Sequence, residues 1–529
     1  MHCVQPNSVE HSCSECPAGQ HTRSDGMVCL SCPLGQYQNL PRQWECQMCL
    51  SGQFRNASMT GESCPVCGQN HYQHLEGQSA CIPCPAGRYT VGEDRTNRDQ
   101  GLKCIRWPIC PFNTTNETIV VKETCEILRT FHIRRNQSIS LIGASDGNVT
   151  IYSRGRGRIF IIDDLGSLRL VNVTLSAEVV DRTCDDLPIE TVLSRTACNN
   201  GGIHVGRNAL LTAVHVSFIK NQHTWGGAVF VESNSSVKLS HCHFSENYGY
   251  AGGSIYMNKM SMLDMVDCTF ESNLLGKGFG FTVGVGLGVA ICAKKNTMLL
   301  ATSCRFRMHA GDLHKGTIYA EYSHAKFVDC DFELNTVYEG SGGIFETSNV
   351  SFVMCRFNSN GGYGWTGVLA GTFGGQTTIY KCVFTNNTET AINIDGLTAS
   401  DGEVNIYASS FLGGRSFFDS TVHIKNAKAS ISSSLFDGNT AKEAGGVGLI
   451  NSKASVITNC TFLRNKAERG FGVAIKSSTV HVLNSSFDAN TAASVDEGGA
   501  VHISELGADH VTFYNCIFAN TVGRGIVFI

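Results

Sequence analysis

The sequence has few charged residues, few prolines and no long apolar run. Asp, Glu, Lys and Arg make up 16 % of the 529 residues, and the formal net charge is −4. Because no basic run is present, the composition argues against a nucleic-acid partner or an anionic membrane held by electrostatics. The most apolar stretch, residues 278–293, is rich in glycine and shorter than the roughly 20 residues that span a bilayer. We therefore expect no membrane span.

A helical pattern is also missing. No stretch of ten or more residues keeps the apolar period of a helix, and only 10 prolines stand beside 56 glycines. Abundant glycine is typical of many short strands joined by tight turns. Since 529 residues exceed one ordinary domain, we expect an all-β chain with at least two modules.

Cysteine is what the sequence has in excess. Of 25 cysteines, 14 lie in the first 125 residues, where large apolar residues are few. Cysteine at this density indicates disulfides in place of a core and an oxidising, extracellular compartment. Eleven Asn-x-Ser/Thr acceptors for N-glycosylation support the same location. They are Asn56, Asn113, Asn116, Asn136, Asn148, Asn172, Asn234, Asn349, Asn386, Asn459 and Asn484.

A secreted protein needs a targeting sequence, yet the chain opens at Met1-His2-Cys3 without an apolar signal-peptide core. It ends in an apolar strand-like stretch, residues 525–529. We interpret the chain as an internal or processed fragment of a longer extracellular or cell-surface protein.

The first 125 residues carry a regular succession of cysteine pairs. Cys-x-x-Cys occurs five times, with first cysteines 16, 17, 18 and 17 residues apart: Cys13/Cys16, Cys29/Cys32, Cys46/Cys49, Cys64/Cys67 and Cys81/Cys84. Pro-x-Gly-x-Tyr follows two of the pairs, at 33–37 and 85–89, and partial versions follow two others. The Pro-x-Gly predicts a tight turn, and the aromatic side chain can lie across the disulfide of its own small loop.

This pattern resembles the ephrin-receptor-like cysteine-rich repeat and, in style, the tumour-necrosis-factor-receptor modules. The resemblance covers residues 13–110 and implies an extracellular stalk and protein-contact module, without catalysis. Zinc is the competing interpretation of paired Cys-x-x-Cys motifs, but a zinc ribbon needs two pairs and no regular succession of five. The simplest disulfide connectivity joins the second cysteine of one motif to the first of the next, and an interleaved pairing stays open. The simplest set is Cys16–Cys29, Cys32–Cys46, Cys49–Cys64 and Cys67–Cys81.

Beyond residue 125 a motif of about 26 residues repeats. Phenylalanine recurs at Phe218, Phe244, Phe270, Phe306, Phe332, Phe357, Phe384, Phe411, Phe436, Phe462, Phe487 and Phe518. A cysteine stands two residues before eight of the twelve, and serine or valine stands there in the other four. An asparagine stands three residues after nine of them: Asn221, Asn247, Asn273, Asn335, Asn360, Asn387, Asn439, Asn465 and Asn490. Gly-Gly often precedes the next strand.

These periods predict a parallel β-helix. Strands this short cannot bury an apolar face alone, but stacked coils pair each strand with its copies and create a continuous interior. Cys and Phe, two residues apart, point to the same side of a strand, so we place both in the core. We expect the asparagines to form a ladder from coil to coil. Strand-like segments such as 138–142 precede the regular repeat, so the β-helix is expected over residues 126–529, after cysteine-rich repeats over residues 1–125.

The repeat region resembles the right-handed β-helices of the pectin-lyase-like type. Its Gly-Gly-Ala-Val and Phe-x-x-Asn motifs are most similar to the repeats of chlamydial polymorphic membrane proteins. The resemblance implies a surface adhesin, so adhesion or assembly is the expected role. We also expect Cys184 and Cys198, which bracket a polar insertion, to pair with each other. The other β-helix cysteines are expected to be mostly free buried thiols, since a cysteine in a packed interior behaves as a small hydrophobe.

The sequence gives little indication of catalytic or metal-binding residues. Asp163-Asp164 and Asp185-Asp186 are adjacent pairs, and adjacent residues on a strand point to opposite faces. His241 and His243 share an outward face, but no third ligand is evident. We predict no catalytic residue, no metal and no cofactor, and therefore a protein that is not an enzyme.

The sequence thus favours a rigid extracellular rod for adhesion or for building a filament, appendage or coat. Its expected partners are other extracellular proteins, including further copies of the chain, and glycans, with no nucleic acid. A secreted polysaccharide-active enzyme or lectin is the competing hypothesis.

Overall fold

The computed structural model forms two compact units, Met1–Ile109 and Cys110–Ile529, called here the cysteine-rich unit and the β-helix unit. It describes residues 2–3, 13–22, 28–68, 71–84, 88–89, 105–106, 108–112, 117–144, 149–153, 157–177, 201–275, 286–362, 367–372, 375–396, 402–417, 419–492, 498–505, 510–521 and 524–528. Every strand and turn reported below lies within these ranges.

The described part of the cysteine-rich unit contains five antiparallel pairs of short strands. They are β1 (His2–Cys3) with β2 (Cys13–Ser14), β3 (Gln20–Thr22) with β4 (Cys29–Ser31), β5 (Gln36–Tyr37) with β6 (Gln47–Met48), β7 (His71–Tyr72) with β8 (Ile82–Pro83), and β9 (Arg88–Tyr89) with β10 (Ile105–Arg106). Large apolar side chains such as Leu34, Trp44 and Leu50 are exposed, whereas Cys16 and Cys49 are fully buried. Disulfides take the place of a core in this unit.

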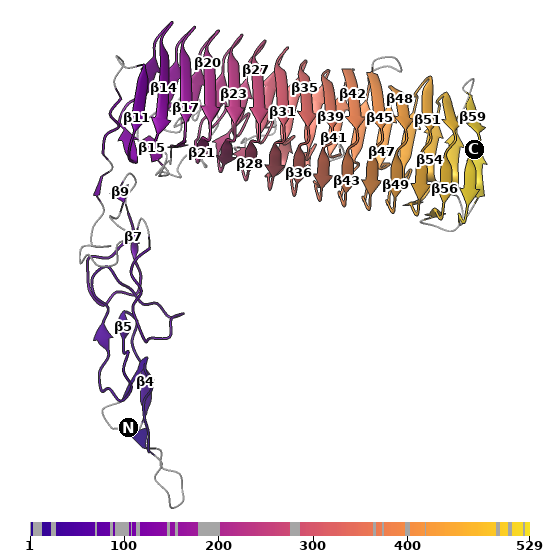
Figure 1. Cartoon of the computed structure of the whole chain (residues 1–529). Helices are drawn as coiled ribbons and strands as arrows, with labels where there is room; N and C mark the ends of the chain where they lie inside the picture. Colours follow the sequence, from indigo (N-terminus) through magenta and orange to yellow (C-terminus); the bar gives the residue numbers. More distant parts are fainter. Residues whose placement is uncertain are drawn as a thin grey trace, which may run out of the picture. The chain divides into compact units, whose positions relative to one another are not determined.

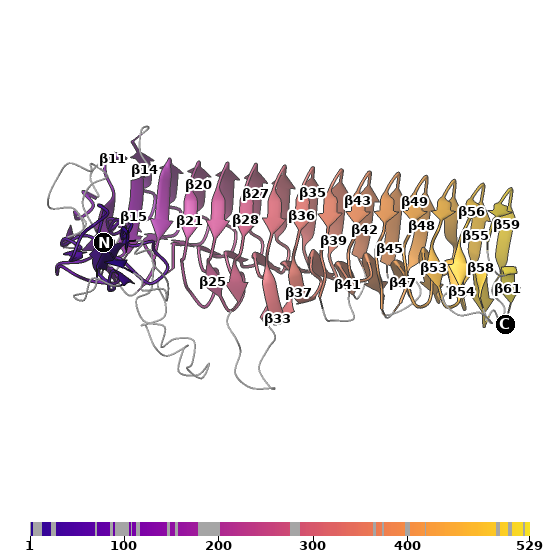
Figure 2. The same cartoon turned by 90° about the horizontal axis from the view of Figure 1, so that it is seen from below.

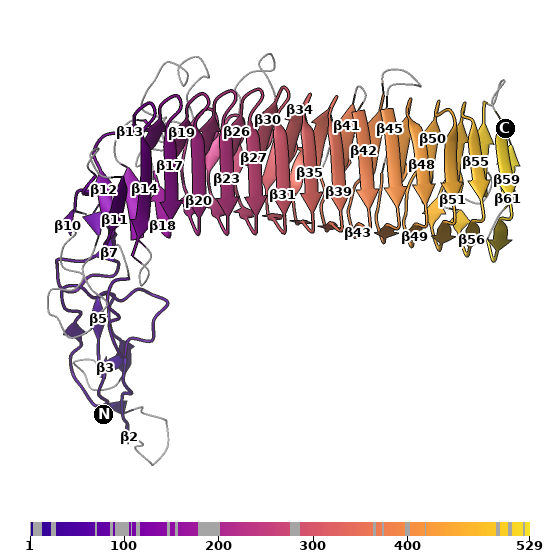
Figure 3. The same cartoon turned by 45° about the horizontal axis from the view of Figure 1, so that its top comes forward.

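The β-helix unit consists of three parallel sheets of 15 strands each, and Figure 1 and Figure 3 show successive coils following one another along it. The first sheet contains β11 (Thr118–Val121), β14 (Ser138–Gly143), β17 (Ser167–Val171), β20 (Leu210–Val214), β23 (Ser236–Ser240), β27 (Met262–Val266), β31 (Met298–Thr302), β35 (His324–Val328), β39 (Asn349–Val353), β42 (Gly375–Tyr380), β45 (Gly402–Tyr407), β48 (Lys428–Ser432), β51 (Ser455–Thr458), β55 (Val480–Leu483) and β59 (Val511–Tyr514).

The second sheet contains β12 (Cys125–Ile127), β15 (Val149–Ser153), β18 (Val173–Ser176), β21 (Ser217–Ile219), β24 (His243–Ser245), β28 (Thr269–Glu271), β32 (Arg305–Arg307), β36 (Asp331–Glu333), β40 (Arg356–Asn358), β43 (Val383–Thr385), β46 (Ser410–Leu412), β49 (Leu435–Asp437), β52 (Thr461–Leu463), β56 (Ser486–Asp488) and β60 (Ile517–Ala519).

The third sheet contains β13 (Phe131–Ile133), β16 (Phe160–Ile162), β19 (Ile203–Val205), β22 (Val229–Val231), β26 (Ile255–Met257), β30 (Ile291–Lys294), β34 (Ile318–Glu321), β38 (Gly343–Glu346), β41 (Leu369–Thr372), β44 (Ile392–Asp395), β47 (Val422–Lys425), β50 (Val447–Ile450), β54 (Gly470–Lys476), β58 (Gly499–Ser504) and β61 (Arg524–Phe528).

Short parallel pairs extend the connections that lead into the third sheet. They are β25 (Tyr248–Gly249) with β29 (Leu274–Leu275), β33 (Ala310–Lys315) with β37 (Thr336–Glu339), and β53 (Lys466–Ala467) with β57 (Thr491–Ala492). Figure 2 shows β25, β33 and β37 on the side of the β-helix that carries the third sheet.

Burial alternates along the strands of all three sheets, as a half-buried strand requires. In β23, Val237 and Leu239 point into the core, and the three serine and lysine residues between and beside them face outward. A residue with positive φ precedes the Cys or Ser of each described turn between the first and second sheets, as Asp267 does with φ 52°. This left-handed residue turns the chain sharply, so that Cys268 enters the interior.

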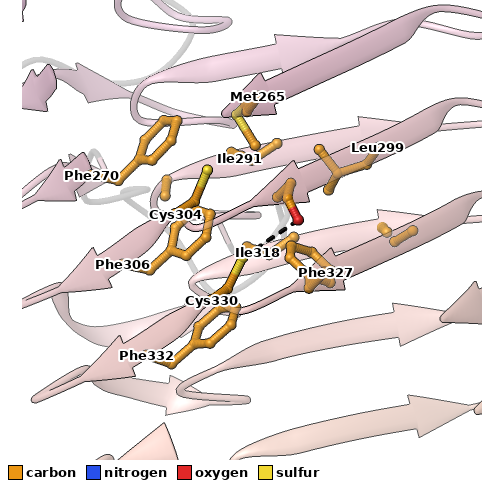
Figure 4. Packing of buried hydrophobic residues seen from close by; sticks show 14 of the residues in the cluster. Met265, Phe270, Ile291, Leu299, Cys304, Phe306, Ile318, Phe327, Cys330 and Phe332 are labelled. Atoms are coloured by element: carbon orange, nitrogen blue, oxygen red, sulfur yellow. Dashed lines mark hydrogen bonds between the residues drawn. The ribbon is translucent and has the colours of Figure 1, made fainter. Parts of the chain in front are cut away.

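The predicted phenylalanine row forms the centre of the core. All twelve rings stack from Phe218 to Phe518, with centroids of neighbours 4.4–5.0 Å apart. Figure 4 shows Phe270, Phe306 and Phe332 in this row, with Cys304 and Cys330 beside it. Dispersion and hydrophobic burial act along the whole row, because each ring contacts the ring above and the ring below.

The predicted asparagine ladder is confirmed. The amide nitrogen Nδ2 of Asn335 donates to Oδ1 of Asn360 at 3.0 Å, and Asn360 donates in the same way to Asn387 at 3.2 Å. The main-chain N–H of each asparagine donates to the same oxygen. In one coil His309 replaces asparagine and its Nδ1 accepts from the main-chain N–H of Asn273 at 3.2 Å. Burial lowers the pKa of His309 to about 4, which keeps it neutral near pH 7.

The β-helix begins earlier along the chain than residue 126, the start expected from the sequence. Strand β11 already pairs in register with β14, and a disulfide joins Cys110 to Cys125 within the first coil. Residues 110–125 therefore lie with the β-helix unit. The first coil does not follow the 26-residue spacing, so the repeat pattern does not indicate it.

Candidate functional site

The cysteine-rich unit has the four disulfides of the simplest connectivity: Cys16–Cys29, Cys32–Cys46, Cys49–Cys64 and Cys67–Cys81. The buried guanidinium of Arg55 reinforces one junction by donating to the carbonyl oxygens of Cys32 and Pro33 at 2.8 and 2.7 Å. Cys184 and Cys198 lie outside the described residues.

Apart from Cys110 and Cys125, which form a disulfide, the described β-helix cysteines are free, as expected. Eight are buried and Cys516 is partly exposed; the eight are Cys242, Cys268, Cys292, Cys304, Cys330, Cys355, Cys382 and Cys460. Burial raises the pKa of Cys460 to about 11 and that of Cys292 to about 12. Since the thiolate is the reactive form, these two thiols are inert near pH 7.

Most acceptor asparagines have accessible side chains. Asn136, Asn234, Asn349, Asn386, Asn459 and Asn484 are exposed, and Asn56 and Asn172 are partly exposed. Asn113, Asn116 and Asn148 lie outside the described residues. A glycan on any of the first eight would project from the surface without displacing the core.

The outward face of the third sheet carries a row of aromatic side chains that we call the aromatic row. His204, Phe230 and Tyr256 occupy equivalent positions on neighbouring strands. The rings of Phe230 and Tyr256 stack with centroids 5.7 Å apart, and Trp225 tilts against Tyr256 at 5.1 Å. Trp225 is 38 % exposed. Burial raises the pKa of Tyr256 to about 12, so its hydroxyl stays protonated and can donate.

Charged groups continue the same face along the next coils. Nζ of Lys294 lies 2.7 Å from Oε2 of Glu321 and 4.4 Å from the centre of the Tyr319 ring. The Tyr319 hydroxyl donates to Oε2 of Glu346 at 2.6 Å. Burial raises the pKa of Tyr319 above its ordinary value, and its hydrogen bond to Glu346 adds to the rise. The carboxylates of Glu321 and Glu346 stand at paired positions of adjacent strands.

The aromatic row and the charged groups beside it are better placed to bind a ligand than the aspartates and histidines considered from the sequence. Asp163 lies 3.6 Å from His132, and Asp164 accepts from the main-chain N–H of Arg207 at 3.1 Å, so each serves a local contact. Asp185-Asp186 lies outside the described residues. His241 stacks on His215 with centroids 4.7 Å apart. Among the described residues, no three His, Cys, Asp or Glu side chains form a metal-binding group.

Sequence reasoning missed the aromatic row, although a signal was present. Phe230 and Tyr256 each stand three residues after the second glycine of a Gly-Gly corner. Aligning the corners places both at the outward position of the next strand, since inward and outward residues alternate.

Two families match parts of the chain. Residues 374–529 match the family described as a right handed beta helix region. Two overlapping stretches, residues 24–61 and 56–104, match the tyrosine-protein kinase ephrin type A/B receptor-like family. No curated protein matches the chain. The described residues include no helix that is long and apolar enough to cross a membrane.

Solved structures with a similar fold differ widely in sequence. A mannuronic acid specific polysaccharide family 6 lyase from human gut microbiota is 11 % identical, with 76 % of this chain and 81 % of that chain covered and a TM-score of 0.31. A GH87 α-1,3-glucanase of Streptomyces thermodiastaticus is 11 % identical, with 77 % of this chain and 63 % of that chain covered and a TM-score of 0.28. PfbA, a surface adhesin of Streptococcus pneumoniae, is 8 % identical, with 73 % of this chain and 85 % of that chain covered and a TM-score of 0.29.

The prediction that the protein is not an enzyme, made from the lack of candidate catalytic residues, is contradicted by the comparisons. A lyase and a glucanase stand among the structures that the chain resembles. At these identities the likeness concerns the fold alone and assigns no activity to the chain. What the chain does contain is a set of ephrin-receptor-like cysteine-rich repeats followed by a right-handed parallel β-helix.

Proposed function

We propose that the protein is an extracellular structural protein whose β-helix serves as a rigid rod for adhesion or for assembly into a filament, appendage or coat. Its partners would be other extracellular proteins, including further copies of the chain, and glycans. The observation that carries the proposal is the continuous stacking of three parallel 15-stranded sheets, with an irregularity of register between β54 and β58 in the third. A solenoid of this kind holds its outer faces in fixed geometry over a long distance, which suits repeated surface contacts.

The cysteine chemistry supports an extracellular location. The disulfides between successive Cys-x-x-Cys motifs form and persist in an oxidising environment, and a cytosolic protein rarely keeps such bonds. The exposed acceptor asparagines agree with passage through a secretory route.

The aromatic row supports an adhesive contact on the third sheet. Partly exposed aromatic rings supply apolar contact area together with a polar edge, and such residues dominate binding surfaces. Trp225, which packs against Tyr256, is 38 % exposed, and Glu232, which pairs with Arg207 at 3.1 Å, also contacts His204 of the row at 3.1 Å. A glycan or a protein loop that stacks on Trp225 would find hydrogen-bonding groups at its edges.

The proposal is tested with the full chain produced in a secreting eukaryotic host. We expect mobility to fall after glycosidase treatment, and we expect binding to extracellular matrix polysaccharides or self-association, measured on coated surfaces and by analytical ultracentrifugation. Trp225→Ala should weaken the adhesive contact at least tenfold. Phe417→Ala, at a side chain that is 69 % exposed and far along the chain from this row, is the control. A chain that is retained in the cell, or that remains monomeric and binds nothing extracellular, contradicts the proposal.

A second candidate function is the binding or cleavage of a polysaccharide by the charged part of the same face. The observation that favours it is the pair Glu321 and Glu346 on adjacent strands, with the Tyr319 hydroxyl and Lys294 beside them. Two carboxylates with a neighbouring proton donor are the minimal groups for acid–base chemistry on sugars. Release of reducing ends from matrix polysaccharides, lost in Glu346→Gln, would support this candidate. No release from any of them would exclude cleavage.

A further inference from the structure

The outward face of the first sheet carries an apolar patch where β27 and β31 lie side by side (Figure 3). Met262 and Met298 occupy paired positions of the two strands, and Leu300 stands two residues further along β31. Met298 is 45 % exposed, and Met262 and Leu300 are partly exposed. We call these side chains and their exposed apolar neighbours the methionine patch; its members are Met260, Met262, Val266, Met298 and Leu300.

The methionine patch is not needed to fill the core. In β27, Leu263 and Met265 point into the interior, so the residues between and beside them face outward. Met260 stands at the corner before β27, where its main-chain N–H donates to the carbonyl oxygen of Lys295 at 3.1 Å, and its side chain is 52 % exposed. A contiguous exposed apolar patch marks an interaction site. Methionine suits such a site because its flexible, polarisable side chain adapts to the surface of a partner.

Four exposed lysines surround the methionine patch on three sides. Lys238 on β23 and Lys326 on β35 flank it on the neighbouring strands, in one row of the sheet. Lys259 and Lys295 stand at the corners that lead into β27 and β31. None of the four has an ion-pair partner within the described part of the chain, in contrast to Lys294, whose Nζ lies 2.7 Å from a glutamate carboxylate. The patch therefore has a positive rim that the chain itself does not compensate.

An aspartate within the patch narrows the kind of partner. Asp264 is the one acid among the outward positions of β23, β27, β31 and β35, all of which the structure describes. An anionic bilayer or a sulfated polysaccharide would set negative charge over Asp264 as well as over the lysines. A protein can place apolar side chains over Met262 and Met298, carboxylates over the rim, and a hydrogen-bond donor opposite Asp264.

The backbone of this face is already satisfied. Each of the four strands is paired on both sides within the sheet, so a partner cannot add a strand here and must use its side chains. A helix with one apolar stripe is the element that packs on the face of a sheet in this way.

We propose that the methionine patch is a docking surface for an acidic amphipathic helix of a partner protein. The apolar side chains supply the buried contact, and the lysine rim selects a negatively charged partner and speeds its encounter. The patch lies on the first sheet and the aromatic row on the third, so this inference goes beyond the proposed function and holds whether or not that row binds a ligand.

The test uses the full chain and a fluorescein-labelled peptide of about 20 residues with leucine on one helical face and glutamate on the other. Fluorescence anisotropy should show saturable binding that weakens severalfold between about 50 and 300 mM NaCl, because salt screens surface charges. Binding should weaken at least tenfold in Lys238→Glu/Lys326→Glu and in Met298→Ser. The same substitutions at exposed sites elsewhere, Lys453→Glu and Met308→Ser, should leave it unchanged.

Two further controls separate this surface from others. A peptide with lysine in place of glutamate should not bind, and Trp225→Ala should bind the acidic peptide as the parent does. Circular dichroism checks that all variants are folded.

Three results overturn the proposal. The first is no binding of the acidic peptide, or binding that the patch variants do not weaken. The second is binding of phosphatidylserine-containing vesicles or of heparin in place of the peptide, lost in Lys238→Glu/Lys326→Glu, which would assign the face to a membrane or a polysaccharide. The third is self-association in analytical ultracentrifugation that Met298→Ser abolishes, which would assign the face to a second copy of the chain.

Discussion

Cysteine has opposite roles in the two units of the molecule. In the cysteine-rich unit the described cysteines pair across successive motifs, while large side chains such as Trp44 and Leu50 remain exposed. In the repeated coils of the β-helix unit most described cysteines are buried and free, and those such as Cys304 and Cys330 lie beside a phenylalanine row (Figure 4). A short repeat with little apolar surface needs covalent links, because it cannot bury enough area to offset the conformational entropy of folding. A long solenoid shares one core among its coils and depends far less on covalent links; the Cys110–Cys125 disulfide lies in its first coil.

Reduction should separate the two units most strongly. With dithiothreitol, the cysteine-rich unit loses four described disulfides, each of which contributes about 2–5 kcal/mol in a small domain. We expect proteases to digest it under native conditions while the β-helix unit survives, as followed by mass spectrometry of the fragments. Equal sensitivity of the two units would show that the β-helix also depends on disulfides.

The next largest effect is expected from the phenylalanine row. Phe332→Ala leaves a cavity between Phe306 and Phe357, whose centroids lie 4.9 and 4.8 Å from that of Phe332. The free energy of unfolding should fall by about 3–5 kcal/mol. Phe417→Ala makes the same substitution at an exposed site and should change it by less than about 0.5 kcal/mol. Urea unfolding followed by circular dichroism measures both. Similar costs at the two sites would contradict a shared core.

The asparagine ladder should matter somewhat less. Asn360→Ala removes the bond from its amide to the carbonyl oxygen of Phe332 at 2.8 Å and the acceptor used by Asn335. Leaving such buried groups unpaired costs about 1–3 kcal/mol. The exposed Asn349, changed to Ala, is the matched control. Hydrogen exchange should report faster opening of the adjacent turns in the first variant only, and unchanged exchange there would mean that the ladder does not hold the coils together.

The smallest effect is expected at a β-helix cysteine. The thiol of Cys330 donates to the carbonyl oxygen of Val328 at 3.4 Å. At the equivalent position of another coil, the Ser409 hydroxyl donates in the same way to the carbonyl oxygen of Tyr407 at 2.9 Å. Cys330→Ser should therefore change the free energy of unfolding by no more than about 1 kcal/mol. By contrast, Cys49→Ser breaks a disulfide and should cost about 2–5 kcal/mol. Thermal unfolding of the two variants compares them directly, and a large loss at Cys330 would assign the thiol a specific role.

Much of the architecture could be predicted because every coil repeats the same residues at the same spacing. The spacing of Phe332 and Asn335 recurs along the chain, so core row, turn and ladder follow from one local pattern and its period. The aromatic row was less visible, since outward positions such as Tyr256 vary from coil to coil. The first coil was placed too late because its strand β11 precedes the regular repeat.

The sequence by itself determined that the chain is a disulfide-linked repeat followed by a parallel β-helix, since each coil repeats the residues that its neighbours need for packing. Only the tertiary structure decided which side chains meet between coils. Glu389 and Val337 are separated by two coil lengths in the chain, and no local pattern links them. Both lie against Gly362 because stacking brings the connections of successive coils together, and a side chain at Gly362 would clash with both.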